Sequence, residues 1–167
     1  MKILEVADRT PDLINQLLEV WEKSVRATHL FLSDREIKNI KEYVPQALNG
    51  IAHLMIAAGE AGRAVAFMGI EDGTLEMLFI SPEERGKGLG KRLIEYGIES
   101  YSVERLAVNE QNPQAKGFYE HMGFHVYKRT GLDEQGEPLS SAVYEPLNNL
   151  SKVNTGHPSA VIESSKS

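Results

Sequence analysis

Residues 78–96, LFISPEERGKGLGKRLIEY, contain the pattern that decides the fold. A short apolar run is followed by three glycines at alternate positions, Gly86, Gly88 and Gly90. Alternate glycines let the main chain approach a ligand closely and turn several N–H groups toward it. The helix expected after them adds the partial positive charge of its N-terminus. The stretch therefore predicts a strand, an anion-binding loop and a helix.

Cations surround this loop, although the chain as a whole carries a formal net charge of -6. Arg85, Lys87, Lys91 and Arg92 all lie within or beside the glycines. Phosphate, and pyrophosphate above all, is the anion that such charge-assisted donors favour. The alternative interpretation is a glycine-rich turn whose basic side chains are only solvated.

The sequence of this loop does not match two better-known phosphate-binding motifs. A nucleoside triphosphatase loop requires G-x-x-x-x-G-K-[ST], but Arg85 stands at its first glycine and Arg92 at its hydroxyl residue. A dinucleotide fingerprint requires G-x-G-x-x-G, whose third glycine is Lys91 or Leu93 here, depending on the register. The loop therefore belongs to neither of these two classes of phosphate site.

Upstream of the loop, the pattern predicts a strand, two helices and an antiparallel meander of three strands. Pro11 begins the first helix, Ser33 and Glu36 form a capping box that opens the second, and Pro45 and Gly50 limit it. Period-two alternation then indicates strands, separated by glycine turns. The predicted strands are residues 2–7, 52–58, 64–70 and 74–80.

Downstream, a helix follows the glycines, then a strand, a further helix and two last strands. Asn112 and Pro113 begin that further helix, and Gly123 ends it. The predicted strands here are residues 105–108, 124–130 and 140–144. This order predicts an α+β fold: a mixed, mostly antiparallel sheet of about seven strands, with four main helices on its faces.

Composition limits the class of protein. With 167 residues, 41% hydrophobic and 25% charged, one globular domain is expected over residues 1–147 and a flexible tail over 148–167. The absence of cysteine excludes disulfides and a thiol acyl-enzyme. A pI near 5.4 disfavours a nucleic-acid binder that would use the basic loop. No signal or membrane segment is apparent, so a cytoplasmic location is expected.

The loop also carries a family resemblance. Arg85-x-x-Gly88-x-Gly90 resembles the [QR]-x-x-G-x-[GA] signature of the general-control-related N-acetyltransferase (GNAT) superfamily. A second GNAT block, N-x-x-A-x-x-x-Y followed by G-F, is similar to residues 112–124. Residues 21–32, WEKSVRATHLFL, further resemble the YjaB-like branch of bacterial acetyltransferases. The resemblance covers about residues 1–147.

This resemblance implies acetyl-coenzyme A as donor and coenzyme A as product. The pyrophosphate would lie on the main chain of residues 85–90, and the pantetheine would pair with residues 78–80 like an added strand. The sheet would therefore splay between its fourth and fifth strands. Asn112 would bind pantetheine besides capping its helix, with Asn109 assisting. The implied cofactor-binding residues are Leu78, Phe79, Ile80, Arg85, Gly86, Lys87, Gly88, Leu89, Gly90, Lys91, Asn109, Asn112 and Tyr119.

The same comparison suggests catalytic residues. Tyr119 matches the family's general acid, although it could instead be a core tyrosine beside Phe118. Glu76 could act as base, directly or through water, or be an exposed strand charge. His29 is the other candidate base, and the alternative for it is a loop histidine with a structural hydrogen bond.

The acceptor would be lined by the loop after the first helix, with Thr28, His29 and Phe31 as its candidate residues. Trp21, at helical spacing from Leu17 and Val25, is expected in the core.

The sequence thus predicts an N-acetyltransferase that acetylates a primary amine of a small molecule or peptide by direct attack in a ternary complex. The alternative is an acyl-coenzyme A binding module without catalysis. No nucleic-acid or membrane partner is expected. No metal is expected either, because His121 and His125 are separated by the helix end at Gly123 and lack an acidic partner. The protein is expected to be a monomer or homodimer.

Overall fold

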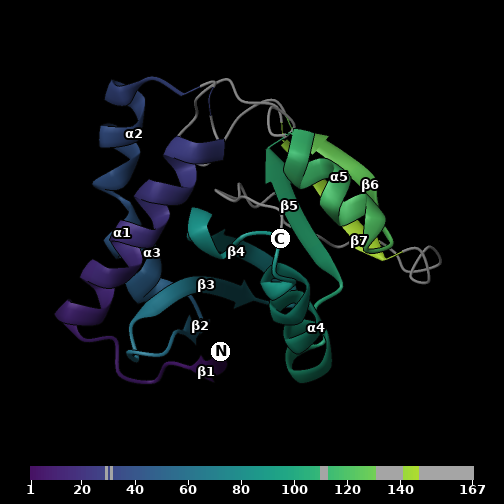
Figure 1. Ribbon diagram of the computed structural model, residues 1–167. Helices are drawn as coiled ribbons and strands as arrows, with labels where there is room; N and C mark the ends of the chain where they lie inside the picture. The colour runs from purple at the N-terminus through teal and green to yellow at the C-terminus, as the bar shows by residue number, and fades with distance from the viewer. Residues whose placement is uncertain (29, 31, 110–112, 131–140, 147–167) are drawn as a thin grey trace.

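The computed structural model describes residues 1–28, 30, 32–109, 113–130 and 141–146 (Figure 1). They form a mixed seven-stranded sheet of order β1-β2-β3-β4-β5-β7-β6. The strands are β1 (Lys2–Glu5), β2 (His53–Ala58), β3 (Ala64–Glu71), β4 (Thr74–Ile80), β5 (Arg105–Asn109), β6 (Phe124–Thr130) and β7 (Ser141–Pro146). The helices are α1 (Pro11–Thr28), α2 (Asp34–Lys41), α3 (Val44–Gly50), the short 3-10 helix η1 (Pro82–Glu84), α4 (Leu89–Tyr101) and α5 (Pro113–His121). The predicted α+β class is confirmed.

Helices cover both faces of the sheet, and each face has its own apolar core. Leu17, Trp21 and Leu48, from α1 and α3, are buried on one face. Leu93 of α4 and Tyr119 of α5 are buried on the other. Burying an apolar stripe of each helix against the sheet stabilises this layered arrangement.

Local sequence signals explain where α1 begins. The hydroxyl of Thr10 accepts a hydrogen bond of 3.2 Å from the N–H of Leu13, and Pro11 takes the first helical position. Ile14, Leu17 and Trp21 then return to the buried face of the helix at intervals of three or four residues. The expected helix start and the expected core position of Trp21 are both confirmed.

The second predicted helix is two helices in the structure. The Ser33–Glu36 capping box is present and opens α2, as expected. The helix ends at Lys41, however, and α3 begins at Val44. Pro45 has no N–H to donate to the carbonyl of Lys41, so the hydrogen-bond ladder cannot pass through this point. The described residues therefore hold five α-helices where four main helices were expected.

A bulge changes the direction of the side chains along β4. In the pairing with β3, Gly69 lies opposite Met77 and Ile70 lies opposite Leu75, so Glu76 is an extra residue. The bulge lets Leu75 and Leu78 share the core beneath α4 and α5, although residues three positions apart face opposite sides of a regular strand. This irregularity was not predicted from the sequence.

The sheet divides at the C-terminal half of β4. Only two residue pairs, Thr74 with Arg105 and Leu75 with Leu106, join β4 to the parallel strand β5. Beyond them β5 continues along β7, as far as the pair Asn109 and Ser141. The two strands diverge after the first residues of β4 (Figure 1), as expected for a sheet splayed between its fourth and fifth strands.

The helices within the described ranges include none that combines the length and the apolar character needed to span a membrane.

Candidate functional site

The glycine-rich loop joins the end of β4 to the start of α4. After Ile80 the buried Ser81 donates from its N–H to the carbonyl of Val65 at 2.9 Å, and η1 follows. Gly86 and Gly88 have φ values of 76° and 79°, and Gly88 is the N-cap of α4. Side chains rarely adopt this left-handed backbone, so glycine is required at both positions. The predicted order of strand, glycine turn and helix is confirmed.

The open side of this loop suits a diphosphate. A Cβ atom placed on Gly86 or on Gly88 would meet no atom within 4 Å, so main chain is presented here without side chains over it. The N–H of Arg92 makes a helical bond of 3.1 Å to the carbonyl of Gly88. The amides in the helix before it have no intrahelical acceptor. Together with the helix dipole, these donors form a cradle for an anion.

Three of the predicted cations lie on the surface around the cradle. Lys87 is 3.2 Å from the carboxylate of Glu84, and Lys91 is 3.9 Å from that of Glu95. Arg92 donates to the carbonyl of Met1 at 3.4 Å. Exposed pairs of this kind are weak. An incoming phosphate can therefore compete for these side chains at little cost.

Arg85 behaves differently from the other three cations. Its Nη2 donates to the carbonyl of Ser24 at 3.2 Å and to the hydroxyl of Ser24 at 3.1 Å. Burial lowers the pKa of this guanidinium, against a smaller opposing effect of Glu83. The structure thus shows this side chain bound to α1. Both expected roles of Arg85 toward the anion, through its side chain and through its main chain, stay predictions.

The sequence analysis missed Ser24 as the partner of Arg85. Ser24 is fully buried, and it lies on the same helical stripe as Leu17 and Trp21. A hydroxyl at a core position needs a hydrogen-bond partner, because burying it without one is costly. That polar residue in an apolar stripe was the available signal, although it does not say which distant residue is the partner.

The strand expected to pair with pantetheine is well anchored. Leu78, Phe79 and Ile80 are all buried, with Leu78 and Ile80 in the core beneath α4 and α5. Phe79 points to the other core, where its ring centroid lies 5.3 Å from that of Phe67. This anchoring fixes the main chain of β4 at the point where β5 has diverged.

Tyr119 of α5 lies in the same core as Leu78 and Ile80. It is fully buried, and its ring centroid is 5.3 Å from that of Phe118 and 6.5 Å from that of Phe124. The interpretation as a core tyrosine beside Phe118 is therefore correct for its ring. Since the core also contains the strand expected to pair with pantetheine, the role as general acid stays a prediction.

The other predicted site residues are only partly placed. Glu76 is partly exposed at the β4 bulge. Thr28 ends α1, and its hydroxyl donates to the carbonyl of Ser24 at 2.8 Å. Asn109 is the last residue of β5, and only its main chain is described. His29, Phe31 and Asn112 lie outside the described residues, as does the predicted tail over 148–167.

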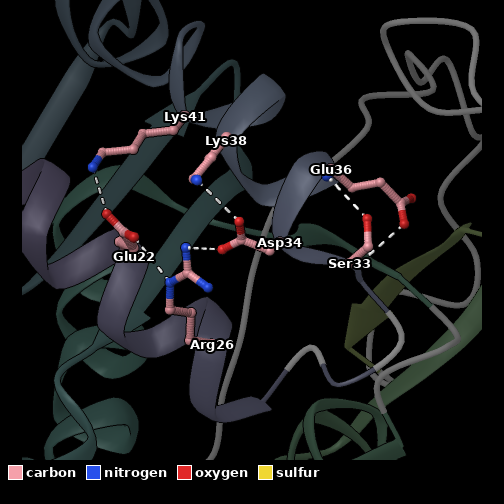
Figure 2. A network of polar contacts seen from close by, with 7 residues as sticks. All are labelled: Glu22, Arg26, Ser33, Asp34, Glu36, Lys38 and Lys41. Atoms are coloured by element: carbon pink, nitrogen blue, oxygen red, sulfur yellow. Dashed lines mark hydrogen bonds and ion pairs between the residues drawn. The ribbon is translucent and has the colours of Figure 1, made fainter.

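Side-chain ion pairs join the end of α1 to α2 on the expected acceptor side (Figure 2). Glu22 pairs with Arg26 at 2.9 Å and with Lys41 at 2.5 Å, and Asp34 pairs with Arg26 at 2.8 Å and Lys38 at 3.0 Å. Arg26 thus connects two carboxylates, one on α1 and one on α2.

These pairs change the acidity of the groups that form them. Lys41 first, and then Arg26, lowers the pKa of Glu22, against an opposing effect of burial. Lys38 first, and then Arg26, lowers the pKa of Asp34. Glu22 first, and then Asp34, raises the pKa of Arg26. Both carboxylates therefore stay charged to a lower pH than isolated ones would.

Within the described ranges, no group of three or more His, Asp or Glu side chains is arranged to hold a metal ion.

Comparison with known proteins agrees with this geometry. The family "Acetyltransferase (GNAT) domain" matches residues 23–136. The chain is 39% identical over 135 residues to the peptidyl-lysine N-acetyltransferase YjaB of Salmonella typhimurium, over 81% of this chain and 88% of the relative.

Solved structures give the same result. Apo-form YjaB from Escherichia coli superimposes with a TM-score of 0.78 at 34% identity, over 88% of this chain and 99% of that one. PaiA N-acetyltransferase from Thermoplasma acidophilum, solved in complex with coenzyme A, superimposes with a TM-score of 0.63 at 22% identity, over 87% of this chain and 99% of that one, which is a likeness of fold. This protein belongs to the GNAT family of acetyltransferases, and within it resembles the YjaB proteins.

Proposed function

We propose that this protein transfers the acetyl group of acetyl-coenzyme A to the side-chain amine of a lysine in a peptide or protein. The open main-chain cradle at Gly86 and Gly88 carries the cofactor part of the proposal. The acceptor part is supported by the YjaB relative, which is named for peptidyl-lysine acetylation. A net charge of -6 mildly favours an encounter with a cationic acceptor.

The chain offers each part of the cofactor a matching surface. The amides of residues 85–90 would hold the pyrophosphate, and Lys87, Lys91 and Arg92, which are close to them in the sequence, would neutralise its charge. Leu78 to Ile80 would pair with the pantetheine where β4 and β5 diverge. Asn109 and Asn112 would complete the pantetheine site, as the family resemblance implies. Acetyl-coenzyme A supplies the acetyl group as a thioester.

Tyr119 is proposed as the general acid of the transfer. The carbon–nitrogen bond to the amine forms as the carbon–sulfur bond breaks, and the departing sulfur needs a proton. The phenol of Tyr119 would supply this proton. Its ring is fixed by Phe118 and Phe124, so the direction of the phenol is set by packing.

The amine must lose a proton before it attacks. Glu76, at the bulge of β4, and His29 are the two candidate bases, acting directly or through water. The chain has no cysteine, so a thiol acyl-enzyme does not form and the proposal is direct attack in a ternary complex.

The proposal is tested by following thiol release from acetyl-coenzyme A with a panel of lysine peptides, free amino acids and polyamines. Wild-type protein should release thiol with lysine peptides, and mass spectrometry should place the acetyl group on the lysine side chain. Thiol release with polyamines alone would contradict the acceptor, and cofactor binding with no release would favour a binding module without catalysis.

The phenol is tested separately from binding. Tyr119→Phe keeps the ring in its aromatic packing and removes the proton, so kcat should fall by about a hundredfold with the affinity for coenzyme A retained. Tyr96→Phe, on the partly buried face of α4, is the matched control and should keep kcat. Unchanged kcat in Tyr119→Phe would remove the general acid from the proposal.

A further inference from the structure

Arg85 joins two parts of the molecule that are far apart in the sequence. It follows η1 at the start of the cradle, and its hydrogen bonds reach Ser24, 61 residues earlier in the chain. Ser24 lies in the last third of α1, and η1 packs against this helix. The contact therefore links the expected pyrophosphate loop directly to the helix that leads into the expected acceptor side.

The link continues along α1 to its end. The carbonyl of Ser24 accepts from Arg85 and also from the hydroxyl of Thr28, one turn later. Hydroxyls that bond back to a carbonyl one turn earlier alter the local bend of a helix. Thr28 is a candidate acceptor residue, so three described residues connect the cradle to the acceptor side through shared hydrogen bonds.

Burial makes this contact specific. Ser24 is 0% exposed, and Arg85 is partly buried. A charged donor that has given up water depends strongly on its few acceptors. Lys87 and Lys91 are themselves exposed and pair with carboxylates only three or four residues away in the sequence. Arg85 is thus suited to fix the position of α1 relative to the glycine-rich loop. Lys87 and Lys91 make no such buried hydrogen bond in the interactions described.

We propose that Arg85 is a positioning residue of the acceptor site: when the main chain of its loop binds the diphosphate, its guanidinium holds the C-terminal turn of α1 in place for the acceptor. This inference rests on the proposed function, because it requires coenzyme A to bind at the loop. It differs from a ligand role in one respect. Loss of the side chain should affect the acceptor more than the cofactor.

The test uses Arg85→Gln against Lys87→Gln. Glutamine at position 85 still satisfies the GNAT signature, but it is too short to keep both bonds to Ser24. Lys87→Gln removes the same charge from the same loop, at a side chain that pairs with Glu84 of η1. The pair therefore separates the loss of a cation from the loss of the link to α1.

Two quantities are measured on each protein: the Kd for coenzyme A by calorimetry and the KM for the lysine peptide. Arg85→Gln should change the Kd by no more than about threefold and raise the peptide KM by about tenfold or more, since small misplacement of a reactant is costly. Lys87→Gln should show the opposite pattern, with a weaker Kd and an unchanged peptide KM. Arg85→Lys, which keeps one donor, should fall between wild type and Arg85→Gln.

A third measurement needs no turnover. Trp21 is the only tryptophan of the chain and lies on α1 one turn before Ser24, so its fluorescence reports on this helix. Coenzyme A should change the emission of the wild-type protein and of Lys87→Gln. It should leave that of Arg85→Gln unchanged at saturating cofactor.

The outcomes separate this inference from the proposed function. Wild-type protein that binds no coenzyme A would overturn both. If the wild type binds and acetylates, a Kd weakened tenfold in Arg85→Gln with an unchanged peptide KM would make Arg85 a ligand and overturn only the positioning role. An undiminished Trp21 response in Arg85→Gln would do the same. Should Arg85→Gln fail to fold, Arg85→Lys and Ser24→Ala carry the same comparison.

Discussion

The side of this molecule proposed to bind the cofactor and the side proposed to bind the acceptor are built by different means. The cofactor side is main chain: a diverging strand, two left-handed glycines and the start of a helix. The acceptor side, where it is described, is held by side chains, with Arg26 joining Glu22 to Asp34 between α1 and α2 (Figure 2). One side is fixed by backbone geometry and the other by charge.

This difference explains why one side is so much easier to identify. A left-handed backbone favours glycine, so the cradle is marked in the sequence by glycines at a fixed spacing. An ion-pair network can be built from many combinations of acidic and basic residues. The cradle can therefore be shared across a family, whereas the acceptor side can change with little effect on the fold.

The largest effect in this comparison is expected from Gly88→Ala. The new methyl group meets no neighbour, but a left-handed residue other than glycine costs about 1–2 kcal/mol. The loop can escape that strain by turning its amides away, so the affinity for coenzyme A should fall by about tenfold or more. Calorimetric titration measures the affinity, and urea denaturation measures the stability.

Gly73→Ala is the matched control for this variant. Gly73 has a φ of 71° in the turn between β3 and β4, where a Cβ would make ordinary contacts. Its loss of stability should be similar, with the cofactor affinity kept. Equal cofactor affinities for the two variants would mean that the cradle is not the binding site.

A smaller effect is expected from Ser33→Ala on the acceptor side. The Ser33 hydroxyl accepts from the N–H of Glu36 at 3.1 Å, and the Glu36 carboxylate accepts from the N–H of Ser33 at 3.0 Å. Losing such a cap costs about 1 kcal/mol, so α2 should fray at its start. Peptide KM should rise while the affinity for coenzyme A stays the same.

Ser100→Ala, on the exposed face of α4, serves as the control for Ser33→Ala and should change neither quantity. A weakened cofactor affinity in Ser33→Ala, with the peptide KM unchanged, would contradict the division of the site into two independently built sides.

The smallest effect is expected from Glu22→Gln, and it depends on pH. Lys41 and Arg26 lower the pKa of Glu22 in the folded protein, so its charge stabilises the fold above the ordinary carboxylate pKa. This contribution is lost as the pH falls through the lowered pKa. The wild type should exceed Glu22→Gln in stability at pH 7 and lose that advantage in acid.

Urea denaturation across pH 3–7 measures this difference, and added salt should reduce it because the partners are partly exposed. Glu99→Gln, which removes the same charge on the exposed face of α4, should show a smaller dependence on pH. A Glu22→Gln advantage at pH 7 would show that the network does not stabilise this corner.

Much of the fold can be predicted from local signals in the sequence. The β3–β4 turn follows from Asp72-Gly73, whose φ values of 50° and 71° few residue pairs tolerate. The start of α2 follows from Ser33 and Glu36. In each case the residues that predict the turn or the helix start are the same residues that form it. A short stretch of sequence is therefore sufficient for the prediction.

Features that depend on distant partners were missed. The bulge at Glu76 changes which residues of β4 face each core, and it becomes visible only in the pairing of β4 with β3. The attachment of Arg85 to Ser24 spans 61 residues. Before the fold was known, the charge of Arg85 pointed to the anion rather than to a buried helix. Tertiary packing decided both cases.

The most direct test of the central claim is to compare coenzyme A with pantetheine in calorimetric titrations of the wild-type protein. Pantetheine keeps the thiol arm and lacks the diphosphate. If main-chain amides of residues 85–90 bind the diphosphate, coenzyme A should bind at least about tenfold more tightly than pantetheine. Equal affinities, or no binding of coenzyme A, would contradict the account.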